Sequence, residues 1–273
     1  GLGSCEANAQ HDARLFALAL LLSSVLVYNS SGKIDEGAIA QMSLVATLSE
    51  ILQEGDTKVL PPALIWVLRD FVLELVDQHG QPQTADAYLA EALDRKQDET
   101  RDAIKKVFTS GRHCFPMPRP AESDRALKRL HQNDLSPDFV RRVAELRRRL
   151  FEGKPKRVRL GAKTVVLDGN MFADLAGRFC AALNEGKTPE VRNELVAMMD
   201  AQSARVGEAC KLAWDALVAE ASVGVDPQVL RDHHLPAWRA KVVAVFERCG
   251  GSDARRLELE RDMDRWFAEM RES

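Results

Sequence analysis

A charged pair, Arg69 and Asp70, directly follows the run of six apolar residues Ala63–Leu68. The run is preceded by Pro61 and Pro62 and ends abruptly at the charges. A short, continuous apolar run bounded by a breaker is typical of a strand buried on both faces of a parallel sheet. In open α/β sheets ligands bind beyond the carboxyl ends of the strands. We therefore expect Arg69 and Asp70 to lie at a ligand-binding edge.

The chemistry of this pair has two interpretations. A carboxylate such as Asp70 can accept two parallel hydrogen bonds from a planar N–H/NH2 face, for example the Watson–Crick edge of guanine. A strand-end ion pair or a helix cap would use the same residue types, and the nine residues Ala63–Phe71 alone favour that structural interpretation. The surrounding elements have to decide between the two.

Helical and strand-like segments alternate around the charged pair. Apolar residues at helical spacing, separated by Gly, Pro and polar turn residues, predict helices before and after the buried strand. A further strand is predicted at His113–Pro118, and its prolines do not suit a central position in the sheet. Thr84 is a candidate N-cap for the helix that follows it. Together they predict a three-layer α/β domain. The predicted helices are 13–22 (running into a strand at 25–28), 35–52, 87–93 and 98–108.

An arginine-rich helix is predicted to begin at Ser136-Pro137. Its apolar positions share one face and its arginines lie elsewhere, with no aromatic residues between them as stacking platforms for bases. A solvated amphipathic face is therefore preferred to a nucleic-acid surface. The apolar positions are Phe139, Val143, Leu146 and Leu150, and the arginines are Arg141, Arg142, Arg147, Arg148 and Arg149.

The last hundred residues have a different character. After a hairpin or connector at Val158–Leu167, only helical patterns follow, with helices at Met171–Leu183 and from Pro189 to about Ala221. The apolar residues that recur at helical spacing in these segments are typical of a bundle core rather than of a cofactor site. These residues include Val206, Ala209, Ala213, Leu217, Trp238, Val242, Val245, Leu259, Met263, Trp266 and Met270. The shift in composition predicts two domains, residues 1–168 and residues 169–273.

Composition excludes several classes of function. A net charge of −3 gives no reason to expect nucleic acid as a partner. The five scattered cysteines lack CxxC spacing and fit a reducing compartment. No metal site is predicted, because neither Cys5 with His11 nor His113 with Cys114 has a second ligand pair at useful spacing. The longest apolar run, Leu15–Tyr28, is too short to cross a bilayer.

Several stretches carry a resemblance to a known family. In chain order they are Gly1-Leu2-Gly3, Phe16–Ser24 leading into Val27–Ser30, Trp66–Phe71, Asp134–Val140 and Asn170–Gly186. This ordered set resembles the guanylate-binding protein and atlastin family of large dynamin-like GTPases. It is more similar to the guanylate-binding branch, because Phe71 follows the charged pair and the chain opens Gly-Leu-Gly.

The resemblance implies a fold, an activity and site residues. It implies α/β followed by all-α: the later part of a GTPase (G) domain, then the start of a helical domain. Arg69 and Asp70 match the motif that reads guanine, and Gly1 matches the last residue of an Asp-x-x-Gly element near the γ-phosphate and switch II. The implied partners are GTP and GDP with Mg²⁺, and a second copy bound through the G domain. The implied location is the cytoplasm, and membrane association is not visible in this chain.

The chemistry of hydrolysis is not visible in these 273 residues. No GxxxxGK[ST] phosphate loop occurs, so no catalytic residue and no Mg²⁺ ligand is assigned to this chain. The lack of an initiator Met suggests a fragment whose missing loop lies upstream, inactive by itself. The alternative is a catalytically dead scaffold that self-associates through its helical part. An atlastin-like branch would continue into hydrophobic hairpins after Ser273, and a guanylate-binding branch into further helices.

Overall fold

The computed structural model describes residues 9–43, 45, 56–121, 124–128, 135–187, 189–220, 226–249 and 253–272. The chain forms two compact units, residues 1–195 and residues 196–273. The first unit combines a parallel sheet with helices, and the second is helical in its described part. The predicted fold class, α/β followed by all-α, is confirmed. The predicted domain boundary after residue 168 stays a prediction.

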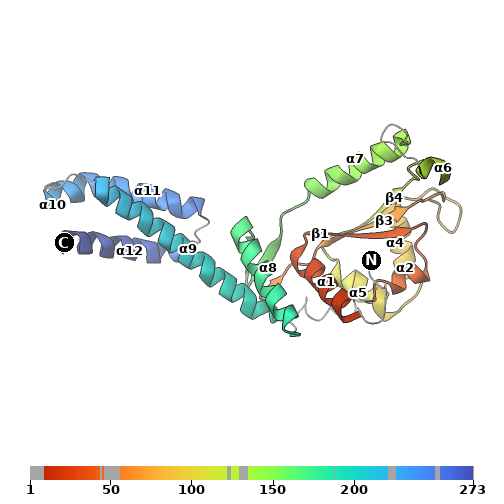
Figure 1. Ribbon diagram of the computed structural model, residues 1–273, viewed down its shortest axis with the longest axis horizontal. Coiled ribbons are helices and arrows are strands. Elements are labelled where there is room, and N and C mark those ends of the chain that lie inside the picture. Colours follow the sequence, from red (N-terminus) through yellow and green to blue (C-terminus); the bar gives the residue numbers. More distant parts are fainter. Residues whose placement is uncertain are drawn as a thin grey trace. The chain divides into compact units, whose positions relative to one another are not determined.

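A three-stranded parallel sheet forms the centre of the first unit, in the order β1-β3-β4 (Figure 1). Its strands are β1 (Val25–Ser31), β3 (Ala63–Arg69) and β4 (Arg112–Met117). The apolar run predicted to be a buried strand is the central strand β3, and its residues from Leu64 to Leu68 are buried. Strand β4, which contains Pro116, lies at an edge, as its prolines predicted.

Seven helices of the first unit are described. The predicted N-cap Thr84 is confirmed, because it accepts a hydrogen bond from Ala87 N at 3.1 Å. The helix predicted to begin at Ser136-Pro137 begins there, and Ser136 caps it by accepting a hydrogen bond from Phe139 N at 3.2 Å. The predicted helix over 35–52 is described only at its start, because residues 44 and 46–55 lie outside the described ranges. The helices are α1 (Ala9–Leu22), α2 (Glu36–Ala40), α4 (Ala85–Asp94), α5 (Glu99–Val107), α6 (Asp124–Leu127), α7 (Pro137–Phe151) and α8 (Gly169–Asn184).

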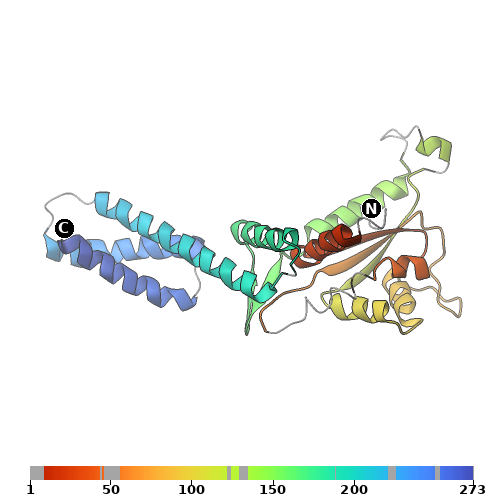
Figure 2. The same ribbon diagram turned by 60° about the horizontal axis from the view of Figure 1, so that its bottom comes forward.

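Helix α7 lies on one side of the sheet, and α4 and α5 lie on the other (Figures 1 and 2). Phe139 and Leu146 of α7 pack on a buried cluster that contains Ile65 and Phe115. Only two of the four predicted apolar positions of α7 therefore pack against this cluster. Its other two positions, Val143 and Leu150, are 41% and 36% exposed.

Strand β1 runs further than the sequence predicted. Its last residues, from Asn29 to Ser31, belong to the strand, and the turn begins only at Gly32, whose φ of 69° suits glycine. The reason is a buried contact, in which Trp66 Nε1 donates a hydrogen bond to Ser30 Oγ at 2.9 Å. A serine that looks like a turn residue is thereby accommodated in the interior of the sheet.

A second, antiparallel sheet has the order β2-β5-β6. Strands β5 (Arg157–Leu160) and β6 (Lys163–Val166) confirm the predicted hairpin, which turns at Gly161 with φ of 59°. Strand β2 (Lys58–Val59) pairs with β5 and was not predicted. Two residues are too few to show a period in the sequence.

The second unit is built from long helices. Three tryptophans meet in its core, where the ring of Trp214 lies 5.7 Å from that of Trp238 and 5.9 Å from that of Trp266. On helix α9 the predicted Val206 and Leu217 lie in the core and Ala213 packs against it, and Cys210 and Trp214, which were not predicted, join them. The elements are α9 (Val191–Glu220, which begins in the first unit), α10 (Pro227–Val229), the π-helical η3 (Leu230–His234), α11 (Leu235–Arg248) and α12 (Asp253–Glu272).

None of the helices in the described ranges combines the length and the apolar composition that crossing a membrane requires.

A buried arginine links the three helices α2, α4 and α5. Arg101 of α5 is 1% exposed, and its Nη2 donates to Glu36 Oε1 of α2 at 2.7 Å. Its Nε donates to the carbonyl of Ala92 on α4 at 3.2 Å, and it also pairs with Asp98. The hydrogen bond from Arg101 lowers the pKa of Glu36, as expected for a carboxylate that a guanidinium holds ionised.

Replacing Arg101 with Met should lower the free energy of unfolding by about 2–4 kcal/mol, because the Ala92 carbonyl and the two carboxylates lose their common partner. Lys105→Met on the same helix is the matched control, since Lys105 pairs with Asp94 and Asp102 at the surface. Denaturant unfolding measures both. Equal stability of wild type and Arg101→Met would contradict the structural role of Arg101.

A buried lysine joins the start of the hairpin to the central sheet. Lys156 is 6% exposed, and its Nζ donates to the carbonyls of Ser23 and Leu60, each at 2.8 Å. Burial lowers the pKa of the Lys156 ammonium to about 7.

This depressed pKa predicts a stability that rises with pH. Between pH 7 and about 10.5 the unfolded chain keeps the Lys156 proton and the folded chain releases it, so the unfolded state binds more protons. The stability of wild type relative to Lys156→Met should therefore increase by about 2 kcal/mol from pH 7 to pH 9. Denaturant unfolding of both proteins at each pH isolates this group. A difference that stays constant with pH would contradict the depressed pKa.

Candidate functional site

The carboxyl ends of the three parallel strands meet at one edge of the sheet. The register aligns Ser31 of β1 with Arg69 of β3, and Arg69 with Met117 of β4. The chain leaves this edge through Gly32, through Asp70 and through the segment that follows Met117. The predicted pair, Arg69 and Asp70, thus lies where an open α/β sheet binds ligands.

Asp70 adopts a conformation that is uncommon for its residue type. With φ of 54°, it is the one non-glycine residue with positive φ among those described. Aspartate tolerates this left-handed region better than most residues, at a cost of about 1 kcal/mol. Such outliers persist where the surroundings determine them, and they are concentrated at functional sites.

Two backbone hydrogen bonds hold the turn at Asp70 from both sides. The amide of Gly32, after β1, donates to the carbonyl of Arg69 at 2.6 Å. The amide of Phe71 donates to the carbonyl of Met117, at the end of β4, at 3.1 Å. The backbone on each side of Asp70 is therefore tied to a neighbouring strand, and the direction of its side chain is set by the sheet.

The Asp70 carboxylate remains open to solvent. Its side chain is 43% exposed, and Oδ1 lies 3.9 Å from Nε of Arg119, two residues beyond β4. An ion pair of this length between half-exposed side chains contributes little to stability. The Arg69 side chain is exposed and makes no hydrogen bond or ion pair with another described residue. Arg69 and Asp70 do not pair with each other, and the long contact between Asp70 and Arg119 is the strand-end ion pair that the structural interpretation allows.

An aromatic pair anchors the residue after Asp70. The ring of Phe71 meets that of Tyr88 on α4 edge to face, with centroids 6.0 Å apart. The Tyr88 hydroxyl accepts a hydrogen bond from Ile34 N at 3.3 Å, and burial raises its pKa. Helix α4 and the segment after β1 therefore both fix the position of Phe71.

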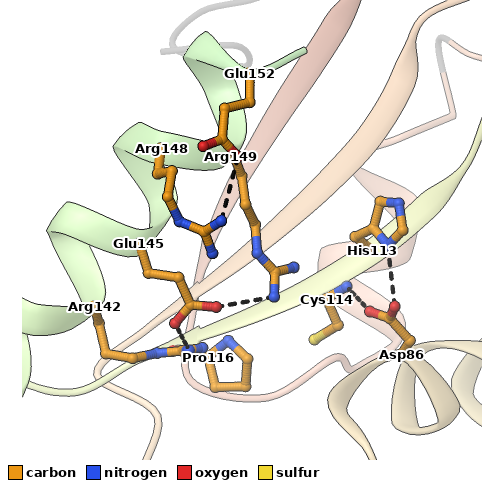
Figure 3. Close-up of polar contacts among 9 residues, drawn as sticks. All are labelled: Asp86, His113, Cys114, Pro116, Arg142, Glu145, Arg148, Arg149 and Glu152. Atoms are coloured by element: carbon orange, nitrogen blue, oxygen red, sulfur yellow. Dashed lines mark hydrogen bonds and ion pairs between the residues drawn. The ribbon is translucent and has the colours of Figure 1, made fainter.

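Strand β4 is held from both faces close to the site (Figure 3). Asp86 of α4 accepts a hydrogen bond from Cys114 N at 2.8 Å and faces His113 Nδ1 at 3.0 Å. On the other face Arg142 of α7 donates through Nε and Nη2 to the carbonyl of Pro116, at 3.1 and 3.0 Å. Its guanidinium also lies 4.0 Å from the centre of the Phe115 ring. These contacts fix the position of the Met117 carbonyl, which accepts the hydrogen bond from Phe71 N.

The arginines of α7 are partly structural. Arg142 and Arg149 both bind Glu145, Arg149 through Nη2 at 2.9 Å, while Arg148 binds Glu152 at 3.2 Å (Figure 3). The prediction of a solvated face is correct for Arg141, Arg147 and Arg148, whose side chains are exposed. It is wrong for Arg142, which donates hydrogen bonds to the Pro116 carbonyl on the edge strand β4.

The described residues do not fit a metal centre. They contain no group of three or more His, Cys, Asp or Glu side chains placed to hold an ion. Asp70 is a single carboxylate beside a cation, whereas Mg²⁺ takes several oxygen ligands in octahedral geometry. His113 faces Asp86, and burial raises the pKa of the Cys114 thiol to about 12, so the pair His113-Cys114 does not supply a thiolate ligand.

Comparison with known proteins decides the family. Residues 1–159 match the family described as "Guanylate-binding protein, N-terminal domain". The chain belongs to the guanylate-binding protein family. The resemblance predicted from the sequence motifs is confirmed.

Individual family members are similar to this chain at about 30% identity. It is 32% identical to Guanylate-binding protein 1 of Chlorocebus aethiops over 222 residues, which are 72% of this chain and 37% of that protein. Identity is 31% to Guanylate-binding protein 2 of Homo sapiens over 232 residues, 76% of this chain and 39% of that protein. Identity is 30% to Guanylate-binding protein 5 of Mus musculus over 245 residues, which are 81% of this chain and 41% of that protein. The chain thus spans about two fifths of the length of these curated relatives.

The predicted site residues have different outcomes. Arg69 and Asp70 lie together at the edge of the sheet, and their roles stay predictions. Gly1 lies outside the described residues. Arg119 and Tyr88 were missed, although a basic residue directly after the predicted strand His113–Pro118 follows the same edge rule that selected Asp70. Tyr88 lay inside a predicted helix and offered no separate signal.

Proposed function

We propose that this chain is part of a large GTPase and binds guanine nucleotides at the carboxyl edge of its sheet, where Asp70 reads the base. The Asp70 carboxylate would accept hydrogen bonds from guanine N1–H and from the 2-amino group. Adenine offers no such pair of donors, so it would form neither of these hydrogen bonds with the carboxylate.

The observation that carries the proposal is the conformation of Asp70. Its left-handed backbone, braced by Gly32 and Met117, projects a half-exposed carboxylate from the strand end where ligands bind in open sheets. Membership of a family whose name states guanylate binding supports the choice of base. Arg69, with no ion partner among the described residues, would flank the base or its ribose.

The phosphate chemistry is assigned to segments other than those described. Gly1 would end an Asp-x-x-Gly element at the γ-phosphate, and an upstream phosphate loop would hold Mg²⁺ and supply the hydrolysis of GTP. Residues 1–168 would form the later part of the G domain and residues 169–273 the start of the helical domain. We expect a cytoplasmic protein that dimerises through its G domain, with membrane association left open.

The substitution Asp70→Asn tests the assignment in the full-length protein. Asparagine also tolerates the left-handed conformation, so the backbone should not change. Its amide would donate to the 2-oxo group of xanthine where the carboxylate accepted from the 2-amino group. We expect GTP affinity to fall about 10- to 100-fold and xanthosine triphosphate affinity to rise above it, as measured by calorimetric titration.

Glu74→Gln is the matched control, because it neutralises an exposed carboxylate four residues further along the same loop. It should change neither affinity. Unchanged GTP binding by Asp70→Asn would refute the role of Asp70. A full-length protein that binds no nucleotide at all would favour the scaffold that acts by self-association.

A further inference from the structure

A cavity of about 480 Å³ lies at the amino ends of the strands of the central sheet, at the opposite ends from Asp70. The first residues of the strands line it, with Val25 from β1 and Ala63 from β3. The end of α7 and the connector of residues 152–157, which leads into β5, also line it, together with Ser110 and His113 next to and in β4. Its volume is within the range of sites for small organic molecules.

Positive charge dominates the wall formed by the connector. Lys154, Lys156 and Arg157 all line the cavity, and no carboxylate in the described ranges forms an ion pair with any of them. The acidic residue of the lining, Glu152, is paired with Arg148 at 3.2 Å. The cavity therefore carries an excess of cations whose partners are not supplied by the described protein.

Lys156 is the most informative of these cations because it is more than nine-tenths buried. An ammonium has three N–H donors, and the carbonyls of Ser23 and Leu60 use two of them. The third donor has no acceptor among the described residues. Burying a cation without a counter-charge is costly, and an anion in the adjoining cavity would relieve that cost.

Apolar side chains line the same cavity. Val25, Leu60 and Ile65 face the same cavity as the three cations. A lining that combines cations with apolar side chains suits a ligand with an anionic group and an apolar or flat body. Inorganic ions would use only half of such a site.

We propose that this cavity binds a small organic anion, with its phosphate or carboxylate group on Lys154, Lys156 and Arg157 and its apolar body on the strand ends. The site is separate from the proposed guanine site, because the two lie at opposite ends of the same strands. Its occupant would tie the connector after α7 to the sheet through Lys156.

Phenyl phosphate and benzoate are suitable probes, with neutral benzyl alcohol as the matched probe that lacks the anion. Methyl NMR of the full-length protein, at the Ile65, Val25 and Leu60 signals, reports on this cavity directly. We expect saturable shifts with at least one anionic probe and not with benzyl alcohol. The tighter of the two anions identifies the natural group as phosphate or carboxylate.

Arg157→Gln should weaken the binding of the anionic probe at least fivefold. Arg159→Gln is the matched control, since Arg159 lies two residues along the same strand, is exposed and does not line the cavity. It should change the affinity less than twofold. Methyl signals that do not move, equal losses in both variants, or equal binding of benzyl alcohol would each overturn the proposal.

Discussion

Two backbone hydrogen bonds, from Gly32 to the Arg69 carbonyl and from Phe71 to the Met117 carbonyl, determine how this chain presents Asp70. They form only because three parallel strands end in register at the same edge. The left-handed conformation of Asp70 is tolerable because both of its neighbours are tied to adjacent strands. The direction of a single carboxylate thus depends on the pairing of segments that are far apart in the sequence.

The register depends in turn on polar groups placed among apolar ones. Ser30 and Trp66 bond across β1 and β3, and Arg142 satisfies the carbonyl of Pro116 at the edge of β4. Arg101 performs a similar role among the helices below the sheet. Each contact is directional, whereas apolar packing is not, so these groups position the elements that the apolar core stabilises.

Local signals in the sequence were sufficient to predict much of the fold. The apolar run of β3 predicted a buried parallel strand, the prolines of β4 predicted an edge, and Thr84 and Ser136 predicted helix starts. Each of these depends on neighbouring residues only. The position of Arg69 and Asp70 at the sheet edge could be predicted for the same reason.

Features that depend on distant partners could not be predicted in this way. The extension of β1 through Ser30 requires Trp66, the structural role of Arg142 requires the Pro116 carbonyl, and β2 exists only through its pairing with β5. The buried Lys156 looks like any lysine of a basic connector until the carbonyls of Ser23 and Leu60 enclose it. The proximity of Arg119 to Asp70 likewise follows from the strand order.

The central claim is that the Asp70 carboxylate reads guanine through two donors of the base. Inosine triphosphate tests it from the side of the ligand, because it keeps N1–H and lacks only the 2-amino group. The measurement is the affinity of the full-length wild-type protein for GTP and for inosine triphosphate by calorimetric titration. The account predicts that inosine triphosphate binds about 10- to 100-fold more weakly, the loss of one hydrogen bond to a charged group. Equal affinity for the two nucleotides would contradict it.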